Sequence, residues 1–395
     1  MKKGKLLKIS LLSASLLVAC APAINANIPA MAEAFPTIPL PMVEMLTTIS
    51  SMFLMISVLT SSFIAKRLGY KQTIVLGLII VAISGIIPAF VQNFYIILIS
   101  RAMLGFGIGL FNSLLVSMIS YFYDGKERTS LFGVQSACEG LGGMSITFIA
   151  GQLLKINWQA PFYAYLIAVP VTMLFIAFVP RVNTKKLLEK NIVLKQNNNV
   201  NQGSYRPIIG YTCLMFIISI LYMTMGIKVS TLMTSQGYAS ASDASLVIIF
   251  LSLGSMISGV LFGKIFEKIE QYTMTFGLIV LGFSMFLIGY ASSAVIVIAS
   301  GFMIGFAYRM VFPYLINKIN KTPVSSSSLA MSIFLAGTNL GSFLAPYGAI
   351  VLQNISGNQS LRNLFYVDGI GFIILAIGSL LIMLFKRKSI KPLIE

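Results

Sequence analysis

Four charged residues interrupt apolar stretches of the chain: Arg101, Glu139, Lys228 and Arg309. A buried charge in a membrane helix costs at least about 2.5 kcal/mol and persists where it has a partner or faces a polar cavity. Glu139 is the acid nearest the middle of such a stretch. Desolvation favours its neutral form, whereas a nearby guanidinium favours the carboxylate. Its protonation would therefore depend on which conformation brings a cation close, as proton coupling requires.

Arg101 and Arg309 are the candidate partners of Glu139. At a rise of ~1.5 Å per residue, Glu139 lies ~14 Å from one membrane surface and Arg101 ~9 Å from the other, within a core of ~30 Å. A long arginine side chain bridges much of the remaining gap. The alternative is a fixed structural ion pair that never changes its protonation. Glu139, Arg101 and Arg309 are thus predicted to act in proton coupling or as an ion pair.

A second group of residues is predicted to line a substrate cavity. The chain has three intramembrane cations, Arg101, Lys228 and Arg309, and one such carboxylate, Glu139. This excess of positive charge would favour an anionic substrate if all of the cations face that cavity. Lys228 has the alternative of reaching to the membrane surface, and the aromatic rings have the alternative of ordinary packing. Prolines close to Asn25 and Asn27 in the sequence free backbone carbonyls, which can line a cavity. The candidates are Asn25, Asn27, Tyr222, Lys228, Tyr308 and Phe312.

The composition excludes a water-soluble fold. Hydrophobic residues make up 57% of the 395 residues and charged residues only 10%, against roughly a quarter in soluble domains. Apolar runs of about twenty residues favour membrane helices over a barrel. The sequence has no His and three Cys at unrelated spacings. We therefore expect no metal site, cofactor or disulfide framework.

The apolar stretches predict an all-α membrane protein of twelve transmembrane helices. A polar segment, residues 181–206, reads as a cytoplasmic linker between a bundle over 1–180 and a bundle over 207–395. The expected spans are 6–28, 43–65, 73–91, 95–122, 130–153, 159–180, 207–234, 242–263, 272–291, 294–317, 325–350 and 363–385.

The positions of Lys and Arg orient this arrangement. Of the 28 such residues, 23 fall at the termini, in the linker and in the loops of one side. The positive-inside rule makes that side cytoplasmic and places both termini there, in a cell membrane. The net charge of +17 then needs no nucleic-acid partner. Lipid and a small molecule are the expected partners, and a monomer suffices.

An internal repeat relates the two sets of six helices. Residues 103–107, MLGFG, recur as 303–307, MIGFA, and residues 77–80, GLII, recur as 277–280, GLIV. Leu141-Gly142 recurs at an offset smaller by one. This parallel duplication pairs the first helix with the seventh. It therefore argues against the alternative that residues 17–20, LVAC, are a lipoprotein cleavage site.

The loop after the second helix, residues 62–71 SFIAKRLGYK, resembles the signature Gly-x-Leu-Ala-Asp-Arg-x-Gly-Arg-Lys of the major facilitator superfamily. Arg67, Gly69 and Lys71 match, while Lys66 stands in place of the acid. The resemblance implies two pseudo-symmetric six-helix bundles and a cytoplasmic charge latch at this loop. A second copy of the latch is expected at Gly263, Glu267 and Lys268.

The resemblance implies a secondary transporter that works by alternating access, not an enzyme. Residues 137–143, ACEGLGG, keep only the last two glycines of the antiporter pattern Gly-Pro-x-x-Gly-Gly. Proton-coupled efflux of amphipathic compounds is the favoured prediction. Transport of an organic anion or sugar-like metabolite is the second, and a non-transporting receptor is the alternative from another class.

Overall fold

The computed structural model describes residues 2–182, 204–237, 239–324, 327–357 and 360–390. Helices dominate these residues, and none of them forms a β-strand. The chain divides into two compact units. Unit 1 comprises Met1–Gly203 with Val324–Ser326, and unit 2 comprises Ser204–Pro323 and Ser327–Glu395. The predicted linker over 181–206 falls largely outside the described residues, so the predicted bundle boundaries stay a prediction.

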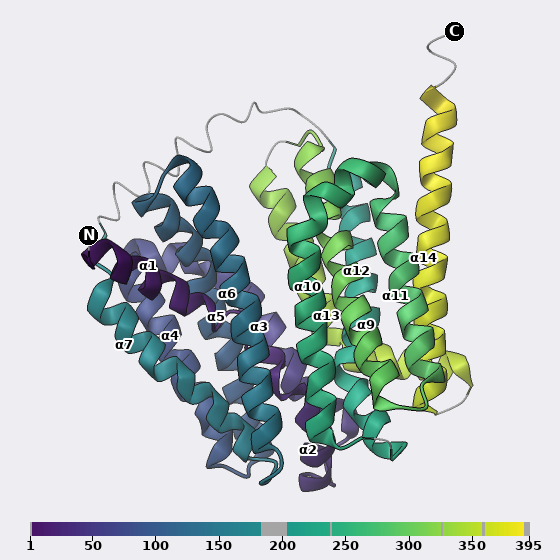
Figure 1. Cartoon of the computed structure of the whole chain (residues 1–395), viewed down its shortest axis with the longest axis horizontal. Coiled ribbons are helices and arrows are strands. Elements are labelled where there is room, and N and C mark those ends of the chain that lie inside the picture. The colour runs from purple at the N-terminus through teal and green to yellow at the C-terminus, as the bar shows by residue number, and fades with distance from the viewer. Residues whose placement is uncertain (1, 183–203, 238, 325–326, 358–359, 391–395) are drawn as a thin grey trace. The chain divides into compact units, whose positions relative to one another are not determined.

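Unit 1 contains six sets of helical structure, shown from purple to teal in Figure 1. In chain order they are α1 (Lys2–Ser15), η1 (Ala21–Asn27), α2 (Ile28–Ala34), α3 (Leu40–Leu68), α4 (Tyr70–Ile86), η2 (Ile87–Ala89), α5 (Phe94–Phe122), α6 (Gly125–Leu153), η3 (Ala160–Ile167) and α7 (Ala168–Phe178).

Unit 2 is built mainly from six long helices, with one short 3₁₀ turn (Figure 1). They are α9 (Arg206–Ser235), α10 (Ala241–Ile269), η4 (Glu270–Tyr272), α11 (Thr273–Tyr290), α12 (Ala294–Lys321), α13 (Ser327–Ser356) and α14 (Leu361–Ile390).

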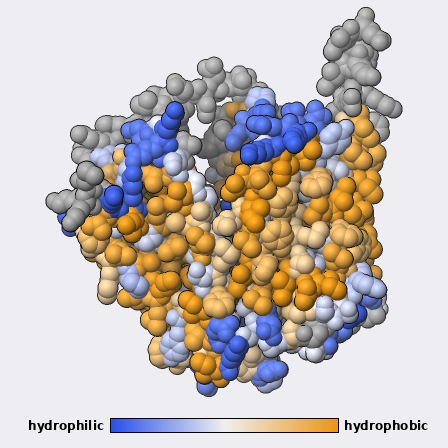
Figure 2. Space-filling model, in the orientation of Figure 1, coloured by the Kyte–Doolittle hydropathy of each residue, from blue (hydrophilic) through white to orange (hydrophobic). Residues whose placement is uncertain are grey.

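The prediction of an all-α membrane protein is confirmed. Among the described residues, nine helical segments are long and apolar enough to cross a membrane, and one of them, Ala241–Tyr290, holds both α10 and α11. Described helical structure lies at each of the twelve predicted spans. Figure 2 shows hydrophobic side chains over the middle of each unit's visible face and hydrophilic side chains near the helix ends. The apolar interior of a membrane offers the backbone no hydrogen bonds. Helices suit it because they satisfy their own backbone hydrogen bonds.

The structure corrects the first predicted helix, 6–28, which is not continuous. The α-helical path stops after Ser15 and resumes at Ile28, with the 3₁₀ segment η1 between. Pro22 and Pro29 lie at the starts of η1 and α2. Proline lacks the N–H that would extend a helix through it, so the chain bends at these positions. The sixth span begins in the same way, with η3 around Pro161.

The internal repeat has a structural counterpart in how helices pack. A Cβ built on Gly105 would lie 2.0 Å from the carbonyl oxygen of Ser50 on α3, and one built on Gly305 would lie 1.9 Å from that of Leu251 on α10. The two glycines occupy equivalent positions on α5 and α12. Each lets one helix backbone approach another closely, which any larger residue would prevent.

Candidate functional site

Arg101 of α5 is buried inside unit 1, with 1% of its surface exposed. Its Nη1 donates a hydrogen bond to the Tyr165 hydroxyl at 3.2 Å. Its guanidinium lies over the rings of Tyr165 and Phe162, 4.8 Å and 5.4 Å from their centroids. Nε and Nη2 have no hydrogen-bond partner among the described residues. A desolvated guanidinium with two unused donors is suited to bind an anionic group.

Tyr165 links Arg101 to the break in the first helix. Its hydroxyl accepts from Arg101 and donates to the carbonyl oxygen of Cys20 at 3.1 Å. Cys20 is the residue immediately before η1, where Pro22 has removed a backbone donor. Tyr165 lies in the 3₁₀ segment η3. Its two hydrogen bonds therefore connect η3, Arg101 of α5 and the break before η1 inside unit 1. Tyr165 lies in an apolar stretch, and nothing in its local sequence indicated a functional role.

Glu139 lies at the middle of α6 and is half-buried. Gln135, one turn earlier, donates to its Oε1 at 3.3 Å. One turn later Gly142 packs so closely on the first helix that a Cβ there would lie 2.0 Å from the Leu16 carbonyl oxygen. Glu139 and the Arg101 chain thus both adjoin the interrupted first helix, at different levels. The contacts of Arg101 are with aromatic side chains here, and its pairing with Glu139 stays a prediction.

The two predicted asparagines of the first helix are buried in η1. Asn25 and Asn27 are 2% and 1% exposed. The amide of Asn27 donates to the Trp158 carbonyl oxygen at 2.7 Å. The Oδ1 atoms of both residues lack a hydrogen-bond partner among the described residues. The donor side of Asn27 is therefore used in holding η1 to the segment before η3, while two acceptors stay available for a ligand.

The predicted aromatic residues of unit 2 form a continuous stack. The rings of Tyr222 and Tyr308 lie 3.9 Å apart at 18°, and Tyr308 and Phe312 lie 6.2 Å apart at 19°. Phe334 of α13 continues the row, 5.7 Å from Phe312. All but Phe334 are partly exposed, and so is Arg309, the neighbour of Tyr308. The structure thus brings α9, α12 and α13 together through flat apolar surfaces beside a cation.

Sequence reasoning missed two buried carboxyl groups. Glu44 on α3 and Asp368 on α14 are both 0% exposed. Each lies near the start of its predicted span, where an acid is expected to reach water, so neither stood out. Lys228 of α9, a predicted cavity residue, is also buried at 2% exposure. Burial of three ionisable groups at such cost is typical of functional positions in membrane proteins.

The first predicted latch loop covers the last turns of α3, a tight turn at Gly69 and the start of α4. Gly69 has φ +94°, a conformation that favours glycine. Lys71 donates to the Ile176 carbonyl oxygen at 2.8 Å, and the Arg67 guanidinium lies 4.7 Å from the Phe63 ring centroid. Lys66 is exposed. The basic residues of this loop therefore tie it to the end of α7 and to its own helix.

The second predicted latch loop also lies at the end of a helix. Gly263, Glu267 and Lys268 lie within α10, which continues to Ile269. No proline interrupts this stretch, and its backbone hydrogen bonds continue until the Glu270 N–H meets the Phe266 carbonyl. The turn falls at Glu270, which has φ +24° and is the one non-glycine residue with positive φ among the described residues.

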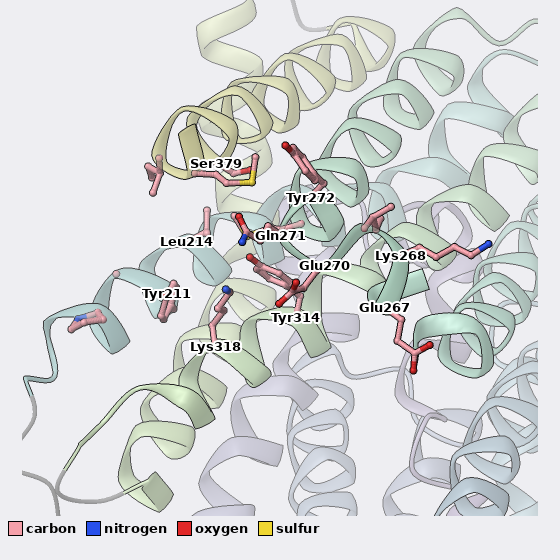
Figure 3. Close-up of a pocket in the computed structure, with 16 residues that line it drawn as sticks. Tyr211, Leu214, Glu267, Lys268, Glu270, Gln271, Tyr272, Tyr314, Lys318 and Ser379 are labelled. Atoms are coloured by element: carbon pink, nitrogen blue, oxygen red, sulfur yellow. The ribbon is translucent and has the colours of Figure 1, made fainter. Parts of the chain in front are cut away.

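A cavity of about 1140 Å³ opens beside this turn in unit 2. Figure 3 shows Glu270, Tyr314 and Lys318 gathered at its centre, whereas Glu267 and Lys268 extend away from them. The Lys318 ammonium lies 5.2 Å from the centroid of the Tyr314 ring. The cavity is therefore lined by both signs of charge and by aromatic rings, at the end of the unit that carries the lysines.

The described residues contain no cluster of three His, Cys, Asp or Glu side chains that would hold a metal ion. What the two units present instead is a set of buried or half-buried single charges, interrupted helices and aromatic surfaces within apolar bundles. These features define a polytopic membrane protein with internal polar sites, as solute transporters have.

The comparisons with known proteins agree. The model of the Major Facilitator Superfamily matches residues 10–321 and, in a second match, 208–393. The chain belongs to this superfamily of membrane transporters. It is 22% identical over 302 residues to the quinolone resistance protein NorA of Staphylococcus aureus, covering 74% of this chain and 76% of NorA.

Two further similar proteins are named as sugar transporters. The glucose/mannose transporter GlcP of Bacillus subtilis is 22% identical over 302 residues, covering 72% of each chain. The crystal structure of a D-xylose-proton symporter superposes with a TM-score of 0.71 at 15% identity, covering 95% of this chain and 96% of that one. The structural likeness shows the shared fold.

Proposed function

We propose that this protein is a secondary active transporter that exports amphipathic compounds in exchange for protons, by alternating access. The observation that carries the proposal is the stack of Tyr222, Tyr308, Phe312 and Phe334. The rings of Tyr222, Tyr308 and Phe312 are partly exposed and offer flat apolar surfaces to planar or amphipathic molecules. The similarity to a quinolone resistance protein supports the same class of solute.

The proposal places the protein in the cell membrane with both termini in the cytoplasm. Its support is the distribution of Lys and Arg, 23 of 28 on one side. Small-molecule substrates and protons are the proposed partners, and a monomer is the proposed working unit. Labelling of single cysteines placed near each terminus, in intact cells and in inverted vesicles, tests the orientation.

Glu139 is the proposed proton-coupling carboxyl of unit 1, with Arg101 or Arg309 as its switching partner. A proton drives a conformational cycle only if it binds the two states differently. Arg101 has unused donors, and Glu139 adjoins the same interrupted helix. A shift in that helix would therefore change the distance between them.

The test uses purified protein in vesicles with an imposed pH gradient. We expect a dye of the amphipathic class to move with protons, and Glu139→Gln to abolish the coupling. Glu33→Gln serves as the matched control because Glu33 is exposed. Unchanged coupling in Glu139→Gln removes that residue from the mechanism. Ligand binding without any solute movement would favour the receptor alternative.

The second candidate is transport of an organic anion or a sugar-like metabolite. Arg101, Lys228 and Arg309 give three intramembrane cations, and GlcP is a similarly distant relative. Neutral variants Lys228→Met and Arg309→Met separate the two functions. Loss of transport for anions alone supports the second candidate, whereas loss of dye export with Tyr308→Leu supports the first.

A further inference from the structure

Asp368 is the most poorly accommodated charge among the described residues of unit 2. Its side chain is 0% exposed, and neither carboxyl oxygen has a hydrogen-bond partner in the described structure. The buried residues one turn away on α14 are Leu364, Phe365 and Phe372. A carboxylate without partners in such surroundings costs several kcal/mol or more, while a neutral carboxyl group costs far less. The arrangement seen here therefore suits the protonated acid.

The helices that pack on α14 supply one internal cation. These helices are α9, α11 and α13. Neither α11 nor α13 contains an Asp, Glu, Lys or Arg residue, and their tyrosines at 290 and 347 are exposed. On α14 itself Arg362 is bound to Gln236 and to the Ala291 carbonyl oxygen. Of the charged residues on α9, Lys228 is the buried one within the span.

Lys228 lies on the face of α9 that meets α14. A Cβ built on Gly371 would lie 3.2 Å from Leu221, and Arg362 reaches Gln236 at 3.1 Å. The two helices are therefore antiparallel neighbours. Lys228 follows Leu221 by seven residues, about two turns on the same face, and Asp368 precedes Gly371 by about one turn. The remaining offset along the axis is about one helical turn, which a lysine side chain spans.

We propose that Asp368 is a proton-binding site of unit 2 and that Lys228 is the cation that displaces its proton during the transport cycle. The O–H bond of the neutral acid breaks, the proton leaves to water, and the carboxylate pairs with the Lys228 ammonium, which stays charged. In the present structure Lys228 has another interaction, so the pair forms when the Lys228 side chain turns from that interaction toward Asp368. The inference rests on the proposed proton-coupled function and adds a second titrating site to it.

A proton fits this site better than a metal cation does. Metal ions such as Ca²⁺ or Mg²⁺ need about six oxygen ligands. The buried residues one turn from Asp368 on α14 are Leu and Phe, and on α9 the Thr224 hydroxyl donates to the Ile220 carbonyl oxygen. A single carboxyl group in an apolar site can bind one proton without further ligands.

Infrared difference spectroscopy of the purified full-length protein in lipid tests the proposal without requiring transport. Neutral carboxyl groups absorb apart from carboxylates. We expect a neutral-acid component that is missing in Asp368→Asn and present in the control Glu33→Gln. We expect Lys228→Met to keep that component to higher pH, because the competing cation is gone. The second variant retains Asp368, so the test survives misfolding of the first.

Two results would overturn the proposal. Identical neutral-acid bands in the wild type and in Asp368→Asn would show that Asp368 does not hold a proton. An unchanged pH response in Lys228→Met would remove Lys228 as the displacing cation. Proton counting in transporting vesicles is the companion experiment, and we expect fewer protons per solute in Asp368→Asn. If the infrared bands change as expected but no solute moves, the transport proposal is wrong and the proton-binding site at Asp368 is still supported.

Discussion

Units 1 and 2 contain glycines at equivalent positions and charges at different ones. Gly105 and Gly305 both bring two helix backbones together. At the same offset of 200, Arg101 corresponds to Gly301, Arg309 to Gly109, and Asp368 to Ala168. At Gly105 and Gly305 the repeat therefore retains a residue that close helix packing needs. Gly109 and Gly301 also lie against backbone oxygens of a neighbouring helix, and an arginine stands at the equivalent position in the other unit. The charges that do not repeat give each unit its own internal site.

This comparison separates the residues that a helical bundle needs for folding from the residues that give it a function. A glycine at a close backbone contact has no substitute, because any Cβ meets a carbonyl oxygen. A buried charge is never required for packing and costs free energy. Unit 1 holds its arginine with Tyr165 and Phe162, while unit 2 offers a ring stack and an acid without hydrogen bonds. We expect the two units to respond differently to changes at these sites and alike to changes at the glycines.

The largest expected effect comes from substitutions that disrupt the close helix packing found in both units. Gly105→Ala and Gly305→Ala each place a methyl group about 2 Å from a backbone oxygen, so each should lower the free energy of unfolding by about 3 kcal/mol or more. Thermal unfolding of the purified protein in detergent measures the loss. Gly133→Ala and Gly259→Ala are matched helical controls with open space around them. Equal melting temperatures for a test variant and its control would show that the close contact is not limiting.

A smaller effect should distinguish the two arginines. Arg101→Lys keeps the charge but loses the planar contact with two rings, so we expect a loss of about 1 to 2 kcal/mol in unfolding free energy. Arg309→Lys should cost within about 0.5 kcal/mol, because Arg309 is partly exposed. Unfolding of both variants under the same conditions gives the comparison. Equal losses would mean that the ring contacts of Arg101 contribute little.

A third comparison concerns the two turns that join the second helix of each unit to the third. Gly69→Ala forces a side chain into φ +94° and should cost about 1 to 3 kcal/mol. Glu270→Gly relieves a positive φ of 24° and should gain up to about 1 kcal/mol. Thermal unfolding again gives both values. A loss of stability in Glu270→Gly would show that the Glu270 side chain contributes more than its strained backbone costs.

Much of the architecture was predictable because lipid restricts the choices. Twenty-residue apolar runs can satisfy their backbone groups only as helices, so composition and length indicated the spans. The breaks at Pro22 and Pro161 were visible as prolines, but the 3₁₀ form of η1 and η3 was not. The continuation of α10 to Ile269 was also missed, because a family motif suggested a loop where no residue breaks the helix.

The candidate site was only partly predictable from the residues. Arg101 and Glu139 stood out because a charge in an apolar run is conspicuous. Asp368 and Glu44 did not, since burial of a residue near a helix start depends on neighbouring helices. Tyr165 was one of sixteen tyrosines, and nothing in its local sequence indicated a contact with Arg101.

The sequence by itself determined that this chain is an all-α membrane protein with two related sets of helices, because hydrophobicity and repetition are local properties of the chain. Only the tertiary structure decided which charges are buried, which side chains meet Arg101, and that rings on α9 and α12 stack and meet a ring on α13. Those facts depend on contacts between helices far apart in the sequence. The pattern of one helix can indicate that such contacts exist but not which residue supplies them.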